Sequence, residues 1–178
     1  MDFISTRGGS AVSAGTAKLL KNIVIPSTYK NFKVTEILEY GFQSSKAETI
    51  IIPDSVTTIG HTAFNGCPSL TSIIIPDSVT SIDYNAFYKC TSLTSVTIGD
   101  GVISIGGNAF SYCTSLTNVY YKGTIEDWCN ISFGDSLPIA ESTIIFLLLL
   151  LSIISFTFAR AVFEATEVPP NLQTIIFL

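Results

Sequence analysis

The chain has few charged residues and few of the side chains that most catalytic and metal sites need. Lys, Arg, Asp and Glu make up 13% of its 178 residues, about half of the usual ~25%, and the net charge is −5. The Lys and Arg residues are scattered, whereas phosphate contacts need clusters of them, so we expect no nucleic-acid partner. His61 is the only histidine and no Cys-x-x-Cys pair occurs, so we expect no metal site.

Catalytic chemistry is not indicated either. No nucleophile is recognisably paired with a base, no Gly-rich phosphate loop joins a strand to a helix, and we expect neither a catalytic residue nor a cofactor. His61 occupies a position that the following repeats fill with Tyr84 and Gly107, so we interpret it as a variable surface residue. Three recurring aspartates could attract Ca²⁺, but turns favour Asp and we interpret them as turn residues. These are Asp54, Asp77 and Asp100.

What the chain has in abundance is internal repetition. Residues 47–69, 70–92 and 93–115 are three copies of one 23-residue unit, of which 70–92 reads LTSIIIPDSVTSIDYNAFYKCTS. An irregular earlier copy spans 20–46, lengthened by a loop near Tyr29–Lys33, and a closing module spans 116–137. Such a period is typical of solenoids, in which each unit buries its apolar side against its neighbours.

Each unit divides into two halves. The first half carries short β-branched runs, as at Ile73–Ile75, which predict strands that proline ends at Pro53 and Pro76. In the second half, Ala-Phe followed three residues later by Cys suits a single helical turn. Stacking the units therefore predicts an α/β solenoid, a short right-handed array with a parallel β-sheet on one face, and rows of Phe64, Phe87 and Phe110 in its core.

The cysteines follow the same period. Cys67, Cys90 and Cys113 are 23 residues apart, so each does the same task in its repeat. Free cysteine packs as a small apolar side chain. We therefore expect three buried, reduced thiols and not a disulfide framework.

The pattern L-x-x-I-x-I-P-x-x-V-x-x-I-x-x-x-A-F-x-x-C resembles the BspA-type leucine-rich repeat, over about residues 20–137. The resemblance implies a leucine-rich-repeat solenoid, and it implies a surface or secreted protein, since the family occurs mainly in such proteins. Residues 120–134 also resemble a module that often closes such arrays. There, Thr124 and Asp127 have the spacing of a helix capping box, and we expect Trp128 to cover the end of the array.

The two ends depart from the repeat. Residues 1–19 read as a flexible lead-in, without the apolar core of a signal peptide. Residues 138–178 form a hydrophobic C-terminal segment, in which 142–159 carries no charge and is just long enough for a membrane helix. Three interpretations stay open for 142–159: a membrane anchor, a buried element packed on the solenoid, or an out-of-frame sequence.

The strand face is the candidate binding surface, because side chains alternate along a strand and the outward ones form charge-poor columns. The predicted partner-binding residues are Ile51, Ile74, Thr97, Tyr120, Thr49, Ser72, Ser95 and Asn118. The leading hypothesis is a non-enzymatic adhesion module that recognises a protein or host-surface partner, at the cell surface or outside the cell, with a membrane possible through 142–159. The alternative is an intracellular, cytoplasmic scaffold or a fragment of a larger repeat protein.

Overall fold

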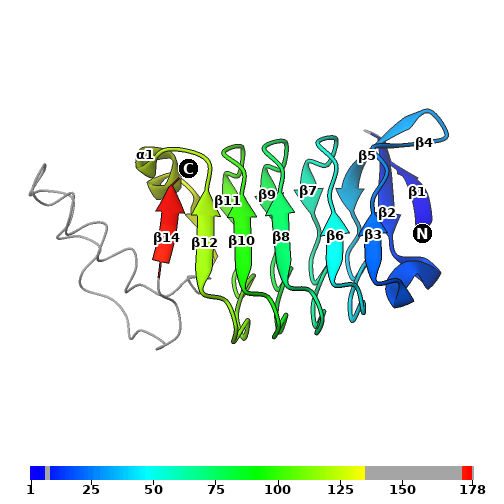
Figure 1. Ribbon diagram of the computed structural model, residues 1–178. Helices are drawn as coiled ribbons and strands as arrows, with labels where there is room; N and C mark the ends of the chain where they lie inside the picture. The colour runs from blue at the N-terminus through cyan, green and yellow to red at the C-terminus, as the bar shows by residue number, and fades with distance from the viewer. Residues whose placement is uncertain (7–8, 135–173, 178) are drawn as a thin grey trace, which may run out of the picture.

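The protein is a β-solenoid whose repeats stack side by side, as the computed structural model in Figure 1 shows. The structure describes residues 1–6, 9–134 and 174–177. Each repeat contributes one strand to a sheet on the near side of Figure 1, here called the front sheet, and one to a second sheet behind it, the back sheet. The parallel array of stacked repeats that the sequence predicts is therefore confirmed.

The front sheet contains the β-branched runs that open each repeat. In spatial order its strands are β3 (Asn22–Val24), β6 (Thr49–Ile51), β8 (Ser72–Ile75), β10 (Ser95–Ile98), β12 (Asn118–Tyr121) and β14 (Thr174–Phe177). Pairing is parallel within β3–β6 and within β8–β10–β12–β14, and residues at the same repeat position lie opposite one another, as Ser72 and Ser95 do. The uniform register keeps each repeat position on one face of the sheet.

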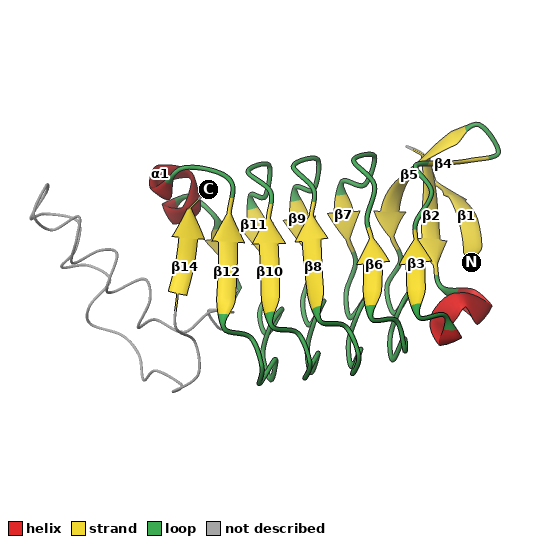
Figure 2. Cartoon of the chain, viewed as in Figure 1, coloured by secondary structure: helices red, strands yellow, loops and turns green. Residues whose placement is uncertain are grey.

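Because a back sheet is present, the prediction of an α/β array with a sheet on one face only is wrong. Its strands are β1 (Asp2–Thr6), β2 (Gly9–Ser13), β5 (Phe32–Ile37), β7 (Thr58–Ile59), β9 (Ser81–Ile82), β11 (Ser104–Ile105) and β13 (Ser132–Phe133), and β4 (Thr28–Tyr29) pairs with β5. Figure 2 shows that strands and loops make up nearly all of the described chain. A two-residue strand is too short to be stable alone, but here each one pairs with the residues at the equivalent positions of the next repeat.

Backbone geometry explains why the Ala-Phe segments do not form the helical turn that we expected. A left-handed residue with φ near 57° precedes each Ala-Phe pair, at Thr62, Asn85 and Asn108. A second left-handed residue precedes each cysteine, at Gly66, Lys89 and Tyr112. An α-helix needs consecutive right-handed residues, so two left-handed residues this close together divide the segment into turns.

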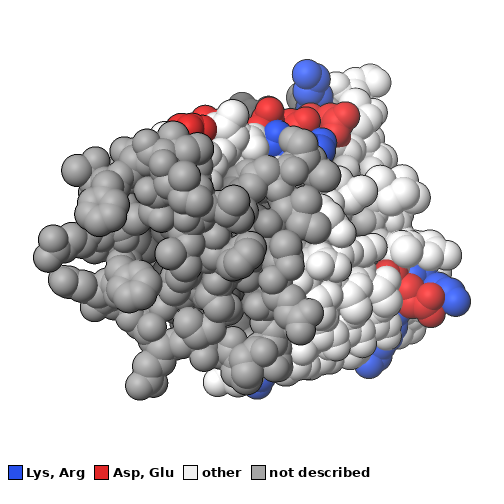
Figure 3. All heavy atoms as spheres, turned by 60° about the vertical axis from the view of Figure 1, so that its left-hand side comes forward, with Lys and Arg blue, Asp and Glu red and all other residues white. Residues whose placement is uncertain are grey.

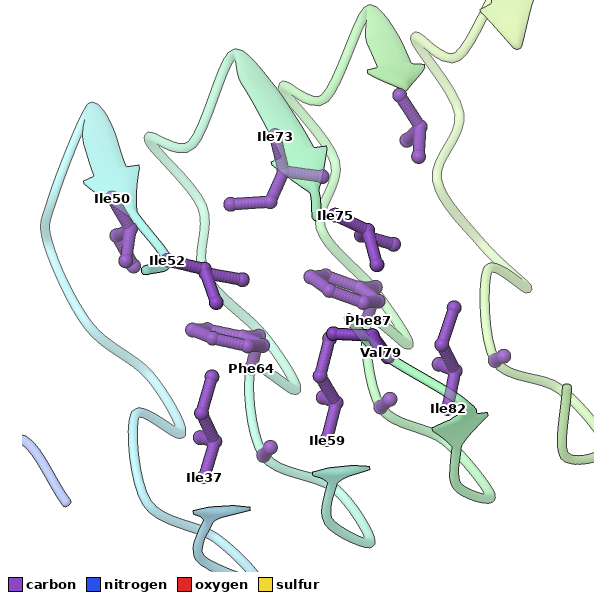
Figure 4. Packing of buried hydrophobic residues seen from close by; sticks show 14 of the residues in the cluster. Ile37, Ile50, Ile52, Ile59, Phe64, Ile73, Ile75, Val79, Ile82 and Phe87 are labelled. Carbon is purple, nitrogen blue, oxygen red and sulfur yellow. The ribbon is translucent and has the colours of Figure 1, made fainter. Parts of the chain in front are cut away.

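The core consists of rows of similar apolar side chains that run along the solenoid (Figure 4). The rings of Phe64, Phe87 and Phe110 stack nearly parallel, with centroids 4.9 and 5.1 Å apart. Isoleucines of the front strands pack on one side of these rings and those of the back strands on the other, as Ile75 and Ile82 do around Phe87 in Figure 4. The predicted Phe row is confirmed.

The three repeat cysteines are free and buried, as predicted. Each thiol also donates a hydrogen bond to the backbone carbonyl of a phenylalanine in the preceding repeat. The Sγ–O distances are 3.2 Å for Cys67 to Phe42, 3.1 Å for Cys90 to Phe64 and 3.1 Å for Cys113 to Phe87. The cysteine row therefore satisfies buried acceptors between repeats as well as filling space.

Residues 1–19, for which we expected a flexible lead-in, include two strands and a 3-10 helix, Gly15–Leu19. Strands β1 and β2 form an antiparallel hairpin, and β2 joins the back sheet alongside β5. Phe3 of this hairpin stacks on Tyr29 at 4.1 Å between centroids. The loop expected near Tyr29–Lys33 is itself a hairpin of β4 and β5, which turns through the left-handed residues Lys30 and Asn31.

The closing module folds as its sequence predicts. Helix α1 (Ile125–Cys129) begins with a capping box, in which the Thr124 hydroxyl accepts from the Asp127 amide and the Asp127 carboxylate accepts from the Thr124 amide. The hydrogen bonds from Thr124 lower the pKa of the Asp127 carboxyl. Trp128 is buried against the ring of Tyr121 at 5.1 Å and so covers the end of the array.

The hydrophobic helix expected at 142–159 lies outside the described residues. No helix within the described ranges is both long and apolar enough to cross a membrane.

Candidate partner-binding face

The front sheet brings all eight predicted binding residues onto one face. Ile51, Ile74, Thr97 and Tyr120 belong to β6, β8, β10 and β12, and register pairing places Ile74 beside Thr97 and Thr97 beside Tyr120. Thr49, Ser72, Ser95 and Asn118 form the second column, two residues earlier in each strand. The two columns share a face because side chains two residues apart in a strand point the same way.

Exposure along the first column is graded. Val24, Ile51 and Ile74 are 61%, 58% and 62% exposed, while their neighbours Ile50 and Ile73 are buried. Thr97 and Tyr120 are half-buried. The strand register predicted from sequence is therefore confirmed, and the exposed aliphatic part of the face lies over β3, β6 and β8. Whether this face binds a partner stays a prediction.

No residue of the front strands is charged. In Figure 3, which shows this face obliquely on the right, the visible charged side chains of the described residues lie along the upper and lower edges and at the lower right, and the white surface between them is uncharged. A face of this kind dehydrates at low cost, because no ion loses its water on contact.

A row of threonines ties the repeats together just before the front strands. The hydroxyls of Thr71, Thr94 and Thr117 each donate to a backbone carbonyl one repeat earlier, at 3.5, 2.9 and 3.3 Å. Sequence reasoning did not assign a role to these residues, although their 23-residue spacing was a sufficient signal. They fix the spacing of the strands that present the face.

The aspartate row lies at the turns that follow the front strands, and it does not form a metal site in the part of the chain that is described. No group of three or more His, Cys, Asp or Glu there could hold a metal ion. Asp77 instead accepts from Lys122, with Nζ–Oδ distances of 3.0 and 3.2 Å. This ion pair is partly exposed and spans from one repeat to the closing module, so it contributes little to stability.

His61 is partly buried and its ring lies in a short aromatic row. Its centroid is 5.5 Å from that of Tyr40 and 5.7 Å from that of Tyr84, and its Nδ1 lies 3.0 Å from Glu39 Oε1. His61 comes shortly after the back strand of its repeat and is far along the repeat from the front strand, which carries the predicted binding residues. The ring is therefore a packed surface residue, and its partners are a carboxylate and two phenols.

The thiols of Cys67, Cys90 and Cys113 are buried, whereas that of Cys129 is exposed. The thiol of Cys90 lies between those of Cys67 and Cys113, and hydrogen bonding to these two thiols together with burial raises its pKa. A nucleophilic cysteine needs a lowered pKa and access to solvent. Cys90 therefore belongs to the core and not to an active site.

Comparison with known proteins supplies a family. The profile described as "BspA type Leucine rich repeat region" matches residues 35–161 in six copies. A search of curated proteins finds no match. No catalytic family is indicated by these comparisons.

Two solved structures share the fold. A leucine-rich cell surface protein from Faecalibacterium prausnitzii A2-165 has 25% identity and a TM-score of 0.57, and the match covers 76% of this chain and 41% of that one. The leucine-rich repeat protein of T. pallidum has 25% identity and a TM-score of 0.54, with 75% and 78% covered. This chain thus spans less than half the length of the first protein.

Proposed function

Because the chain belongs to the BspA-type leucine-rich repeat family, we propose that it is a non-enzymatic protein-binding module that works in adhesion and recognises its partner through the front sheet. The observation that carries this proposal is the exposed aliphatic column of Val24, Ile51 and Ile74 on a face without charge. Solenoids commonly bind through such extended faces, and contiguous exposed apolar surface marks interaction sites.

The chemistry of the face sets the kind of partner. The aliphatic column is flanked by hydroxyl and amide groups of Thr49, Ser72 and Asn22, all exposed. A partner surface rich in charge would lose its hydration here without gaining ion pairs. We therefore propose a protein partner that offers an apolar, hydrogen-bonding surface with few charges.

The proposed location is the cell surface. The match to a leucine-rich cell surface protein and the family membership both support it. The membrane anchor expected at 142–159 stays a prediction. Protease shaving of intact cells tests the location: loss of the front-sheet peptides from the cell-associated protein is expected. Their full protection in intact cells, with digestion only after lysis, contradicts the surface location and favours the intracellular scaffold.

The binding experiment uses a yeast-displayed library of extracellular protein domains as the probe. For each domain that binds the wild-type chain, its affinity is compared between the wild type and the Ile74→Asp variant. This substitution puts a charge at the centre of the aliphatic column. Interface energy concentrates near the centre of a patch, so a loss of about 100-fold in affinity is expected. Circular dichroism of the variant should be unchanged, because Ile74 lies on the solvent side of the sheet.

Ile103→Asp is the matched control, since Ile103 is 66% exposed and directly precedes the back strand β11. Tyr84→Asp is a second control in the aromatic row. Retained binding by Ile74→Asp with loss of binding by either control would assign recognition to the back of the molecule and refute the proposal.

A further inference from the structure

Strand β14 extends the front sheet beyond the closing module. It pairs in parallel with β12, and the pairing places Thr174 opposite Asn118 and Ile176 opposite Tyr120. Figure 2 shows β14 beside β12, where the strand of a further repeat would lie. Residues 135–173 separate it in sequence from the closing module.

The sequence of this strand agrees with its position. Residues 170–177 read PNLQTIIF, and residues 68–75 read PSLTSIII. In this sequence alignment Leu172 corresponds to Leu70, which opens the repeat 70–92. The family profile ends its match at residue 161, so the repeat character of this segment rests on the strand register and this alignment.

The closing module leaves room for such a strand. Its own strand β13 pairs with β11 and so continues the back sheet, while its helix α1 covers the core through Trp128. Neither continues the front sheet, in which β12 pairs with β14. The backbone groups at the outer edge of β12 therefore find their partners in β14, as edge groups must when they are not left to solvent.

We infer that Thr174–Phe177 is the opening strand of a further repeat and that Ile176 adds a position to the partner-binding column. Ile176 has the register position of Tyr120, Thr97 and Ile74. The strand carries no charge, so it continues the uncharged face. The part of this inference that concerns binding rests on the proposed function. The partner is of the same kind, an apolar and hydrogen-bonding protein surface.

Hydrogen exchange of the full chain tests the strand without any partner. The amides of Thr174 and Ile176 face β12 in the parallel register, so they should exchange at least about tenfold more slowly than in an isolated peptide of residues 170–178. The variant Ile176→Pro, which removes a strand amide that faces β12, should lose the protection of Thr174 while β8 and β10 keep theirs. Exchange of the wild-type segment at the peptide rate would overturn the inference.

The binding arm uses domains from the displayed library that bind the wild-type chain. Ile176→Asp should weaken their binding by about tenfold, less than a change at the centre of the column, while Ile103→Asp leaves it unchanged. Full affinity of Ile176→Asp, with the amides protected, would overturn the added binding position. If no domain binds the wild-type chain, the proposed function and this binding position fail together, and the exchange result alone decides the strand.

Discussion

Phe87 lies at the centre of a row of stacked rings and is fully buried. Phe87→Ala removes its ring from between those of Phe64 and Phe110 and leaves a cavity that two rigid sheets cannot close. We expect the free energy of unfolding to fall by about 3–5 kcal/mol. Thermal and urea unfolding of the full chain should show the loss.

The control for this variant is Ile103→Ala, at an exposed site. Its effect should stay within roughly 0.5 kcal/mol, as is usual for surface substitutions. Equal stability losses in the two variants would mean that the phenylalanine row does not hold the repeats together.

The cysteines give a second test at the residue scale, with an internal control. Cys67, Cys90 and Cys113 are buried and Cys129 is exposed. A maleimide should label only Cys129 in the native protein, and all four cysteines after denaturation without a reductant. Because the pKa of Cys90 is raised, raising the pH to about 9 should not expose a thiolate there. A disulfide between repeat cysteines, detected by mass spectrometry, would contradict the core row.

Helix α1 depends on its capping box. Asp127→Ala removes the carboxylate that accepts from the Thr124 amide and should destabilise the closing module. The pKa of Asp127 is lowered in the folded state, so its contribution is present above the ordinary carboxyl pKa and is lost as the pH falls through the lowered value.

The difference in stability between wild type and Asp127→Ala should therefore be largest near neutral pH and shrink below about pH 4. Urea unfolding at several pH values measures it. A difference that grows as the pH falls would show that the carboxylate does not stabilise the helix.

The turn after β10 differs from the other turns and should not tolerate the residue that they share. The repeats before it carry Ser55 and Ser78, but this repeat has Gly101, and a Cβ at Gly101 would collide with the carbonyl oxygen of Asp77. Gly101→Ser therefore restores the repeat consensus and should still destabilise, by roughly 1–3 kcal/mol. An increase in the melting temperature would contradict this account of the turn.

Local sequence rules predicted the front strands, but they missed the back strands and the turns of the Ala-Phe segments. β-Branched runs ended by proline predicted the front strands and their register, because alternation within a strand directly determines which residues are buried. The back strands were missed because pairs such as Ser81–Ile82 are too short to be recognised alone and form only by pairing between repeats. The Ala-Phe segment was interpreted as helical because sequence alone does not reveal the left-handed conformation of Thr62 or Asn85.

At the scale of the whole molecule, the 23-residue period predicted the stacking, the phenylalanine and cysteine rows, and the family. The period could not predict the N-terminal hairpin, which carries no repeat and joins the back sheet through β2. It did contain a signal for β14, since PNLQTIIF matches the opening of a repeat. That match is short and is separated in sequence from the array. The register of β14 with β12 is what identifies it as part of a repeat.

We propose that the front sheet is the binding face of an otherwise structural array. The array supplies stability through buried rows, while the exposed aliphatic column contributes little to that stability. Substitutions should therefore separate into two groups. Those in the core rows should reduce folding and binding together, and those in the front columns should reduce binding alone.

The most direct test is saturation mutagenesis of this chain, with the variants displayed on yeast. The variants are sorted once for folded expression and once for binding of one domain from the library. We predict that positions at which binding is lost and expression is retained will gather at Val24, Ile51, Ile74, Thr97 and Tyr120. If such positions gather instead at Tyr40, His61 and Tyr84, or along Asp54, Asp77 and Asp100, the front sheet is not the binding face and the central claim is wrong.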